Sequence, residues 1–249
     1  MYINSFPGSF GDNLKVCLPD EYDMSFFIKF PETSLIIVKE DHDLPGNVHL
    51  DFTKVLAKIK TEKQHANLLK LLGKWLDDKN YLLVEKFQAF INSRFIHVML
   101  QMENRIVVNG KLATLRYIRQ GPAHTIHVTE SLNVKYSVDF VPSILLNQGQ
   151  SLVRDIIGQW EAVPKPSQCY NPKYTSFRTS YFRQEHAIIA GKHNLKNALR
   201  MVKKFRDSHL NMHKMKSYFI KTHFLWKTKQ ENDAYWRKSL TTIIIDVIY

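Results

Sequence analysis

The chain contains only two cysteines among its 249 residues, Cys17 and Cys169. Two thiols cannot build a framework of several disulfides or a zinc site made mainly of cysteine, and such sparing use is typical of a reducing cytoplasm. No apolar, uncharged run reaches roughly eighteen residues, and the start, MYINSFPGSF, lacks a basic stretch followed by an apolar one. We therefore expect a soluble cytoplasmic protein with no membrane partner.

Acidic residues are outnumbered, since 35 lysines and arginines face 23 aspartates and glutamates for a net charge of +12. This excess favours polyanionic partners such as nucleic acid, nucleotides or an anionic membrane, but its sign does not choose among them. Hydrophobic residues make up 44% of the chain, enough for one large domain or two lobes with sizeable cores.

The periodicity of apolar residues predicts a mixed α/β (α+β) fold. Strands are predicted at residues 16–30, 34–40, 105–118, 124–130 and 133–144. Residues 51–78 have helical spacing, as one helix or two short ones, and a further helix is predicted at 80–100. A run rich in proline and turn formers covers 161–172, after which the chain is mostly helical. We thus expect a sheet-bearing lobe at 1–160 and a helical lobe at 161–249.

The stretch PGSFGDNLKVCLPDEYDMSFFIKF, residues 7–30, contains a Gly-Ser turn followed by two acids one residue apart. On an extended strand Glu21 and Asp23 point the same way, and paired carboxylates suit a hard divalent cation. Asp139 is the best candidate for a third acid, because a lone charge in its otherwise apolar strand would be costly.

Three such acids can hold metal ions that align an attacking hydroxyl and stabilise a leaving pyrophosphate. The backbone N–H groups of the Gly8–Ser9 turn and the Ser9 hydroxyl can bind triphosphate oxygens. The stretch is therefore suited to nucleotidyl transfer. The alternative is that Glu21 and Asp23 are only the solvated face of an edge strand.

The motifs GSF, EYD and SVDF, in this order, resemble the Gly-Ser, E-h-D and third-Asp pattern of the Mab-21 nucleotidyltransferases, the family of cGAS and the animal cGAS-like receptors. The resemblance implies a bilobal nucleotidyltransferase with its active site in a cleft between a catalytic sheet lobe and a helical lobe. It implies that Glu21, Asp23 and Asp139 are catalytic and hold Mg²⁺ or Mn²⁺. The implied reaction joins ATP and GTP into a cyclic dinucleotide of the cyclic GMP-AMP type, a second messenger of innate immunity.

Three later segments, FRTSYFRQEHAII, LRMVKKF and KSYFIKTHFLW, also resemble the family. With the Gly-Ser turn they imply a set of nucleotide-binding residues: Ser9, Arg178, Ser180, Lys203, Ser217 and Tyr218. In that set Arg178 reads a base, Tyr218 stacks on one, Lys203 contacts the triphosphate, and Lys221 lies nearby. From the residues alone, Arg178 could instead be a surface arginine, Tyr218 a core aromatic and Lys203 part of a solvated helix face.

The sequence departs from the vertebrate members of the family in two respects. EHAIIAGKHNLKN, where they carry a cysteine-rich zinc thumb, has no cysteine, so no zinc is expected and the chain is more similar to the thumbless insect type. The Gly-Ser turn begins at Gly8 and the chain stops within TTIIIDVIY, so we expect a protein shortened at both ends. A catalytically inactive Mab-21 relative that binds a nucleotide or a partner therefore remains an alternative, as does an enzyme similar to oligoadenylate synthase.

Basic residues recur along two predicted helices. The nucleic-acid-binding candidates are Lys54, Lys58, Lys192, Lys196 and Arg200. Each run could face duplex phosphates or could simply be a solubilising surface. Because the thumbless relatives resemble RNA sensors, we expect double-stranded RNA as the activator, with double-stranded DNA the less favoured alternative. A dimer on the nucleic acid is a further hypothesis.

Overall fold

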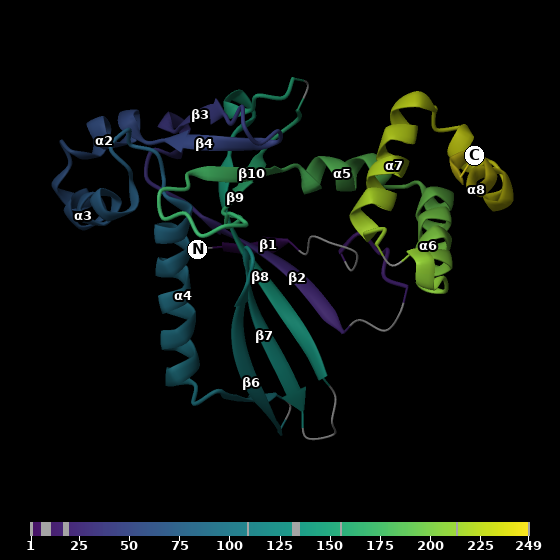
Figure 1. Ribbon diagram of the computed structural model, residues 1–249, viewed down its shortest axis with the longest axis horizontal. Helices are drawn as coiled ribbons and strands as arrows, with labels where there is room; N and C mark the ends of the chain where they lie inside the picture. The colour runs from purple at the N-terminus through teal and green to yellow at the C-terminus, as the bar shows by residue number, and fades with distance from the viewer. Residues whose placement is uncertain are drawn as a thin grey trace. The chain divides into compact units, whose positions relative to one another are not determined.

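The computed structural model describes residues 2–5, 11–16, 20–108, 110–130, 135–154, 156–212 and 214–248. The chain divides into two compact units, which we call the sheet unit (Met1–Phe6 and Asp20–Tyr181) and the helical unit (Pro7–Pro19 and Phe182–Tyr249) (Figure 1). The lobe boundary predicted at residues 160 and 161 precedes this division, because the strands Trp160–Val163, which spans it, and Ser176–Ser180, which follows it, both hydrogen-bond within the large sheet.

The sheet unit is built on a mixed, mostly antiparallel sheet in which ten strands are described. These strands are β1 (Tyr2–Ser5), β2 (Glu21–Ile28), β3 (Ile37–Glu40), β4 (Asn47–Asp51), β5 (Arg105–Val108), β6 (Lys111–Gln120), β7 (Ala123–Glu130), β8 (Lys135–Leu146), β9 (Trp160–Val163) and β10 (Ser176–Ser180). Their order is β3-β4-β10-β9-β8-β7-β6-β5, and β2 lies parallel to β8 with β1 on its far side. The parallel β2–β8 pair brings the start of the sheet together with residues more than a hundred positions later.

The helices of this unit are α2 (Thr53–Ile59), α3 (Ala66–Trp75) and α4 (Val84–Gln101). The predicted helical region 51–78 thus forms two short helices, separated by the 3-10 turn Lys63–His65. Helix α4 runs along β6 to β8 (Figure 1), and the ring of its Phe95 packs against those of Phe26 and Phe140. One face of these strands is therefore covered by a helix.

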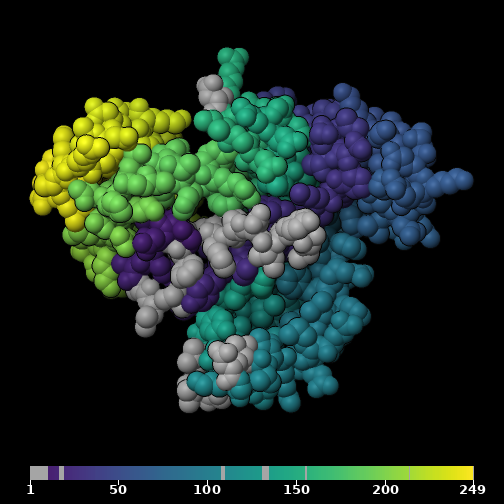
Figure 2. Space-filling model, turned by 180° about the vertical axis from the view of Figure 1, so that it is seen from behind, coloured from purple at the N-terminus to yellow at the C-terminus, as the bar shows by residue number. Residues whose placement is uncertain are grey.

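The helical unit consists of α5 (Phe182–Ile189), α6 (His193–Asp207), α7 (Ser217–Gln230) and α8 (Leu240–Ile248), with segment 11–16 packed on them. Leu14 lies in the apolar core of these helices, and Figure 2 shows the purple segment against the green helices. No helix in the described part of the chain is long and apolar enough to cross a membrane.

A buried polar network anchors β7 against α4. His124 is fully buried, with Nε2 2.8 Å from Gln88 Oε1 and Nδ1 2.6 Å from the Tyr117 hydroxyl. Burial lowers the pKa of His124 to about 4 and raises the pKa of Tyr117 to about 12. Gln88 Oε1 is an acceptor, so His124 donates to it from Nε2. The Tyr117 hydroxyl also lies 2.6 Å from Asn92 Oδ1 on α4, which joins β6 to the same network.

This network predicts a pH-dependent stability. His124 titrates near 6.5 when unfolded and near 4 when folded, so unfolding takes up a proton between these values. The contribution of His124 to the free energy of unfolding is fully present above pH 6.5 and is lost as the pH falls towards 4. The total loss is about 3 kcal/mol. We expect His124→Gln to flatten the pH dependence of the free energy of unfolding in this window. The exposed His42, changed to Gln, is the control, and an equal slope in both variants would refute the assignment.

Candidate active site

Three carboxylates converge on neighbouring strands of the sheet unit. Asp23 on β2 is directly beside Asp139 on β8, and Glu21 is beside Ser137 in the same parallel ladder. One oxygen each of Glu21, Asp23 and Asp139 lies within 4.8 Å of the other two. The sequence predicted this grouping from residue spacing and from the cost of a lone buried acid.

The alternation of side chains along β8 explains why these acids lie on the face of the sheet opposite α4. Phe140 points to α4, where its ring centroid is 5.6 Å from that of Phe95. Asp139 therefore points to the opposite face, together with its cross-strand neighbours Asp23 and Thr125. Apolar packing behind the sheet thus presents the acids away from α4.

Thr125 on β7 is a contact that the sequence analysis did not identify. Its hydroxyl donates a hydrogen bond of 2.6 Å to Asp139 Oδ1, and the residue is only 1% exposed. A threonine in an alternating strand carries no signal of its own. Only the antiparallel register of β7 with β8, which pairs Thr125 with Asp139, identifies it.

The chemistry of this donor set fits a divalent cation. Three carboxylates are the oxygen ligands that Mg²⁺ and Mn²⁺ prefer. Among the described residues, no other group of three or more His, Cys, Asp or Glu side chains comes together in this way.

Two of the predicted nucleotide-binding residues, Arg178 and Ser180, lie on β10 of the sheet unit. A third, Ser9, is outside the described residues. Arg178 is exposed and Ser180 is half-buried, next to the fully buried Phe177. Arg178 is in register with Asn47 on one side and Val163 on the other. Alternation on β10 therefore turns Arg178 away from the core that Phe177 fills, and its base-reading role stays a prediction.

The remaining predicted nucleotide-binding residues belong to the helical unit. Lys203 is 6% exposed, and its ammonium group donates to the backbone oxygen of Leu14 at 2.9 Å. Burial lowers the pKa of Lys203. Ser217 accepts a hydrogen bond of 2.9 Å from Arg206, whereas Tyr218 is 52% exposed at the start of α7. Lys203 is therefore not on a solvated helix face, and Tyr218 is not a core aromatic.

Lys221 forms a buried ion-pair cluster that holds segment 11–16 on the helical unit. Its ammonium group lies 2.7 Å from Asp12 and 2.8 Å from Glu185, and His186 Nδ1 is 2.9 Å from Asp12. Burial alone would lower the pKa of Lys221, but the two carboxylates more than offset it, so this pKa is raised. The sequence analysis did not foresee the cluster, because its partners are far apart in the chain.

The predicted nucleic-acid-binding residues occur in both units. Lys54 and Lys58 are exposed on α2, and Lys58 lies 3.6 Å from Glu62. Lys196 and Arg200 are half-buried along α6.

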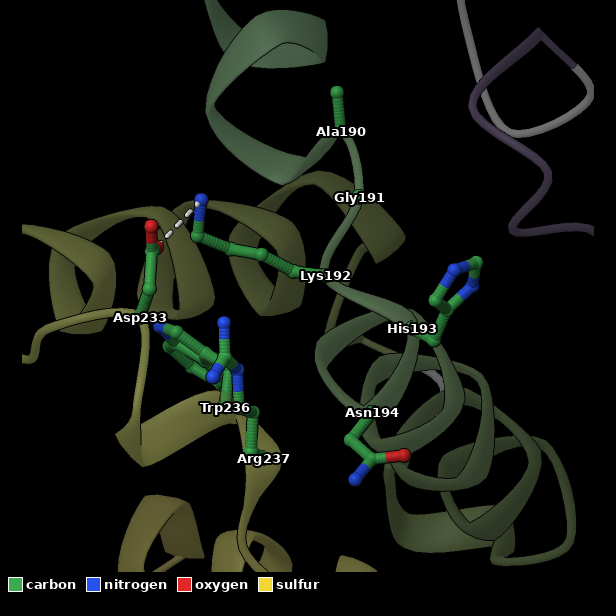
Figure 3. A pocket seen from close by; sticks show the side chains of 8 residues that line it. All are labelled: Ala190, Gly191, Lys192, His193, Asn194, Asp233, Trp236 and Arg237. Carbon is green, nitrogen blue, oxygen red and sulfur yellow. Dashed lines mark ion pairs between the residues drawn. The ribbon is translucent and has the colours of Figure 1, made fainter.

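Lys192 precedes α6 at a pocket of about 490 Å³ whose lining includes His193, Trp236 and Arg237 (Figure 3). Its ammonium group is 3.2 Å from the exposed Asp233. Arg237 is a further cation at this pocket that the sequence analysis missed, because it lies more than forty residues after Lys192, beyond α6 and α7.

Three acids on adjacent strands of a mixed sheet, in a chain that also has a helical unit, define a nucleotidyltransferase-type domain. The Mab-21 protein nucleotidyltransferase domain matches residues 10–191, and the Mab-21 protein HhH/H2TH-like domain matches residues 194–249. The chain belongs to the Mab-21 family.

Similar proteins of known name are found in insects. The chain is 61% identical over 240 residues to a cyclic GMP-AMP synthase-like receptor of Lucilia cuprina, covering 96% of this chain and 65% of that protein. It is 42% identical to cyclic GMP-AMP synthase-like receptor 1 of Drosophila erecta, covering 97% of this chain and 55% of that protein. It is 40% identical to cyclic GMP-AMP synthase-like receptor 1 of Drosophila melanogaster, covering 97% of this chain and 65% of that protein. The chain thus spans less than two thirds of the length of these relatives.

Proposed function

We propose that this protein is a nucleotidyltransferase that joins ATP and GTP into a cyclic dinucleotide when it binds nucleic acid, as part of innate immune signalling. The observation that carries the proposal is the convergence of Glu21, Asp23 and Asp139 within 4.8 Å. The names of the insect relatives, cyclic GMP-AMP synthase-like receptors, support the product class. A cytoplasmic location would place such a receptor where foreign nucleic acid appears.

In this proposal Glu21, Asp23 and Asp139 hold Mg²⁺ or Mn²⁺. The cation, when bound, supplies Lewis-acid stabilisation of the charge that develops on phosphate oxygens. Asp139 also accepts a proton from the attacking ribose hydroxyl. Arg178 and Tyr218 orient bases, while Ser9, Lys203 and Ser217 bind phosphates. Lys203 would exchange its hydrogen bond to the Leu14 carbonyl for one to a phosphate.

Product analysis tests the proposal directly. Purified protein is incubated with labelled ATP and GTP, Mg²⁺ or Mn²⁺, and duplex RNA or duplex DNA, and the products are separated and weighed by mass spectrometry. A cyclic dinucleotide is the expected result. Linear oligonucleotides would favour an enzyme similar to oligoadenylate synthase. No product under any condition, together with retained nucleotide binding, would favour a catalytically inactive member of the family.

Duplex RNA is the expected activator. Basic helices without base-reading motifs contact phosphates and recognise duplex shape, and A-form RNA differs from B-form DNA in its groove geometry. We expect activation to fall steeply with salt and to depend little on sequence. Charge reversal of Lys54, Lys58, Lys192 and Lys196 to Glu should reduce activation by RNA and leave any basal activity unchanged.

The control for this prediction reverses two exposed lysines outside the candidate set, Lys79 and Lys229. Activation by DNA alone, full activity without any polyanion, or an equal loss in the control variant would each contradict the prediction.

Tyr218 should contribute through its ring. If a base stacks on it, Tyr218→Ala weakens nucleotide use by about 1–3 kcal/mol, whereas Tyr218→Phe retains most of it. Its 52% exposure predicts that neither change unfolds the protein. The measurements are kcat/KM for each nucleotide and the free energy of unfolding. Equal kinetics in the two variants would remove Tyr218 from the binding site.

A further inference from the structure

Thr125 is the side chain that contacts the third carboxylate. Its hydroxyl donates to Asp139 Oδ1 at 2.6 Å, within the normal range for an O–H···O bond. The residue is 1% exposed, so water has almost no access to compete for this contact. The hydrogen bond occupies one acceptor position of Oδ1 and leaves Oδ2 and the remaining position of Oδ1 for other partners.

The position of this hydroxyl is well determined by its surroundings. Threonine is β-branched, so its χ1 angle has few accessible values. On the opposite face of the same strand, His124 bonds to Gln88, and Gln88 in turn donates to the Pro164 carbonyl at 2.8 Å. The backbone of β7 is therefore held from behind at the residue next to Thr125.

A terminal carboxylate rotates with little preference about χ2, because this is a broad sp³–sp² torsion. Two acids that share a cation must nevertheless present their oxygens at fixed positions, and partners beyond the ligands commonly provide that restraint. Asp23 and Asp139 are directly beside each other in the parallel ladder. A fixed donor on the far side of Asp139 would hold its carboxylate plane while the other oxygens face Glu21 and Asp23.

We propose that Thr125 is a positioning residue of the nucleotidyl-transfer site, which sets the orientation of the Asp139 carboxylate and thereby the affinity of the three-acid cluster for its divalent cation. This inference rests on the proposed function. It assigns to β7 a part in the site alongside the β2 and β8 acids. Thr125 touches neither substrate nor cation in this role and acts only through Asp139.

The test compares Thr125→Val, which removes the hydroxyl at nearly constant shape, with Thr125→Ser, which retains it. Thr129→Val is the matched control, because Thr129 lies four residues further along β7 on the same face and is in register with Lys135 rather than with an acid. Asp139→Asn tests the site itself. Thr125→Ala provides a second hydroxyl deletion should Thr125→Val fail to fold.

Two readouts are measured for every variant. One is the Mn²⁺ concentration for half-maximal product formation at saturating nucleotide. The other is Mn²⁺ binding in the presence of a non-hydrolysable ATP analogue, from the EPR signal of free Mn²⁺, which does not depend on turnover. Removing a residue that orients a metal ligand typically costs about 10–100-fold in affinity or activity. We expect both readouts to shift by this factor in Thr125→Val and Thr125→Ala. In Thr125→Ser and Thr129→Val both readouts should stay within about threefold of wild type.

Three results would overturn the inference. The first is that Mn²⁺ binding and the half-saturating Mn²⁺ concentration are unchanged in both Thr125→Val and Thr125→Ala. The others are that Thr129→Val shifts these two quantities as much as Thr125→Val does, or that Thr125→Ser shifts them as much as Thr125→Val does. The failure of the proposed function gives a different result. In that case Asp139→Asn itself leaves Mn²⁺ binding and product formation unchanged. Loss of both in Asp139→Asn with a normal Thr125→Val would reject the role of Thr125 alone.

Discussion

Removing two of the three clustered acids, by Glu21→Ala together with Asp23→Ala, is expected to abolish product formation. Divalent cations supply several kcal/mol of transition-state stabilisation, so the loss should be at least on the order of a thousandfold in turnover. Both residues start β2 on the face opposite α4, and neither belongs to the apolar core. The fold and the binding of polyanions should therefore persist.

The measurement is steady-state turnover with Mg²⁺ and with Mn²⁺, alongside circular dichroism and duplex RNA binding. A matched control removes two acids elsewhere in the sheet unit, both exposed, by Glu40→Ala with Asp78→Ala. It changes the net charge equally and should leave turnover near that of wild type. Turnover near wild type in the Glu21 and Asp23 variant would reject the metal assignment.

The second large effect is expected on stability, from Lys221→Met. The side chains of Lys221 and Asp12 are 13% and 7% exposed and lie 2.7 Å apart, and Glu185 is 2.8 Å from the same ammonium group. Methionine has a similar length but removes the ammonium group from both carboxylates, so that Glu185 loses this contact and Asp12 keeps only its contact with His186. Breaking a buried ion pair from one side typically costs about 3–5 kcal/mol, and we expect a loss of this size in the free energy of unfolding.

Urea unfolding followed by tryptophan fluorescence measures this loss. Lys229→Met, an exposed change on the same helix, should stay within about 0.5 kcal/mol of wild type. Adding Asp12→Asn and Glu185→Gln to Lys221→Met should recover much of the stability, because the unpaired charges are then removed as well. A cost below about 1 kcal/mol for Lys221→Met alone would mean that the pair behaves as a surface salt bridge.

The interior of the helical unit was the least accessible to sequence reasoning. Sequence reasoning predicted a mostly helical chain after residue 172, and Leu195, Ala198 and Leu199 of α6 are buried. It did not indicate that Lys203, on the same helix, lies inside and donates to Leu14. Nor did it place segment 11–16 on this unit. The local sequence around a helical lysine is the same whether its ammonium group is hydrated or donates a hydrogen bond to a backbone carbonyl far away in the chain.

The boundary between the units shows a related limit. The proline-rich run at 161–172 predicted a boundary, yet β10 follows it and pairs with both β4 and β9. Turn formers mark where a chain bends. They do not indicate whether the chain then returns to the same sheet, because strand pairing depends on residues far away in sequence.

The sequence by itself determined the strand character around Glu21 and Asp23, their common face, and Asp139 as the acid that would join them, because each rests on local alternation and on the cost of an isolated charge. Only the tertiary structure decided that β2 runs parallel to β8 with Asp23 beside Asp139, that Thr125 donates to Asp139, and that Lys221 is paired with Asp12 and Glu185. The physical reason is that these contacts depend on strand register and helix packing, which arise from many apolar contacts acting together and leave no pattern within any one segment.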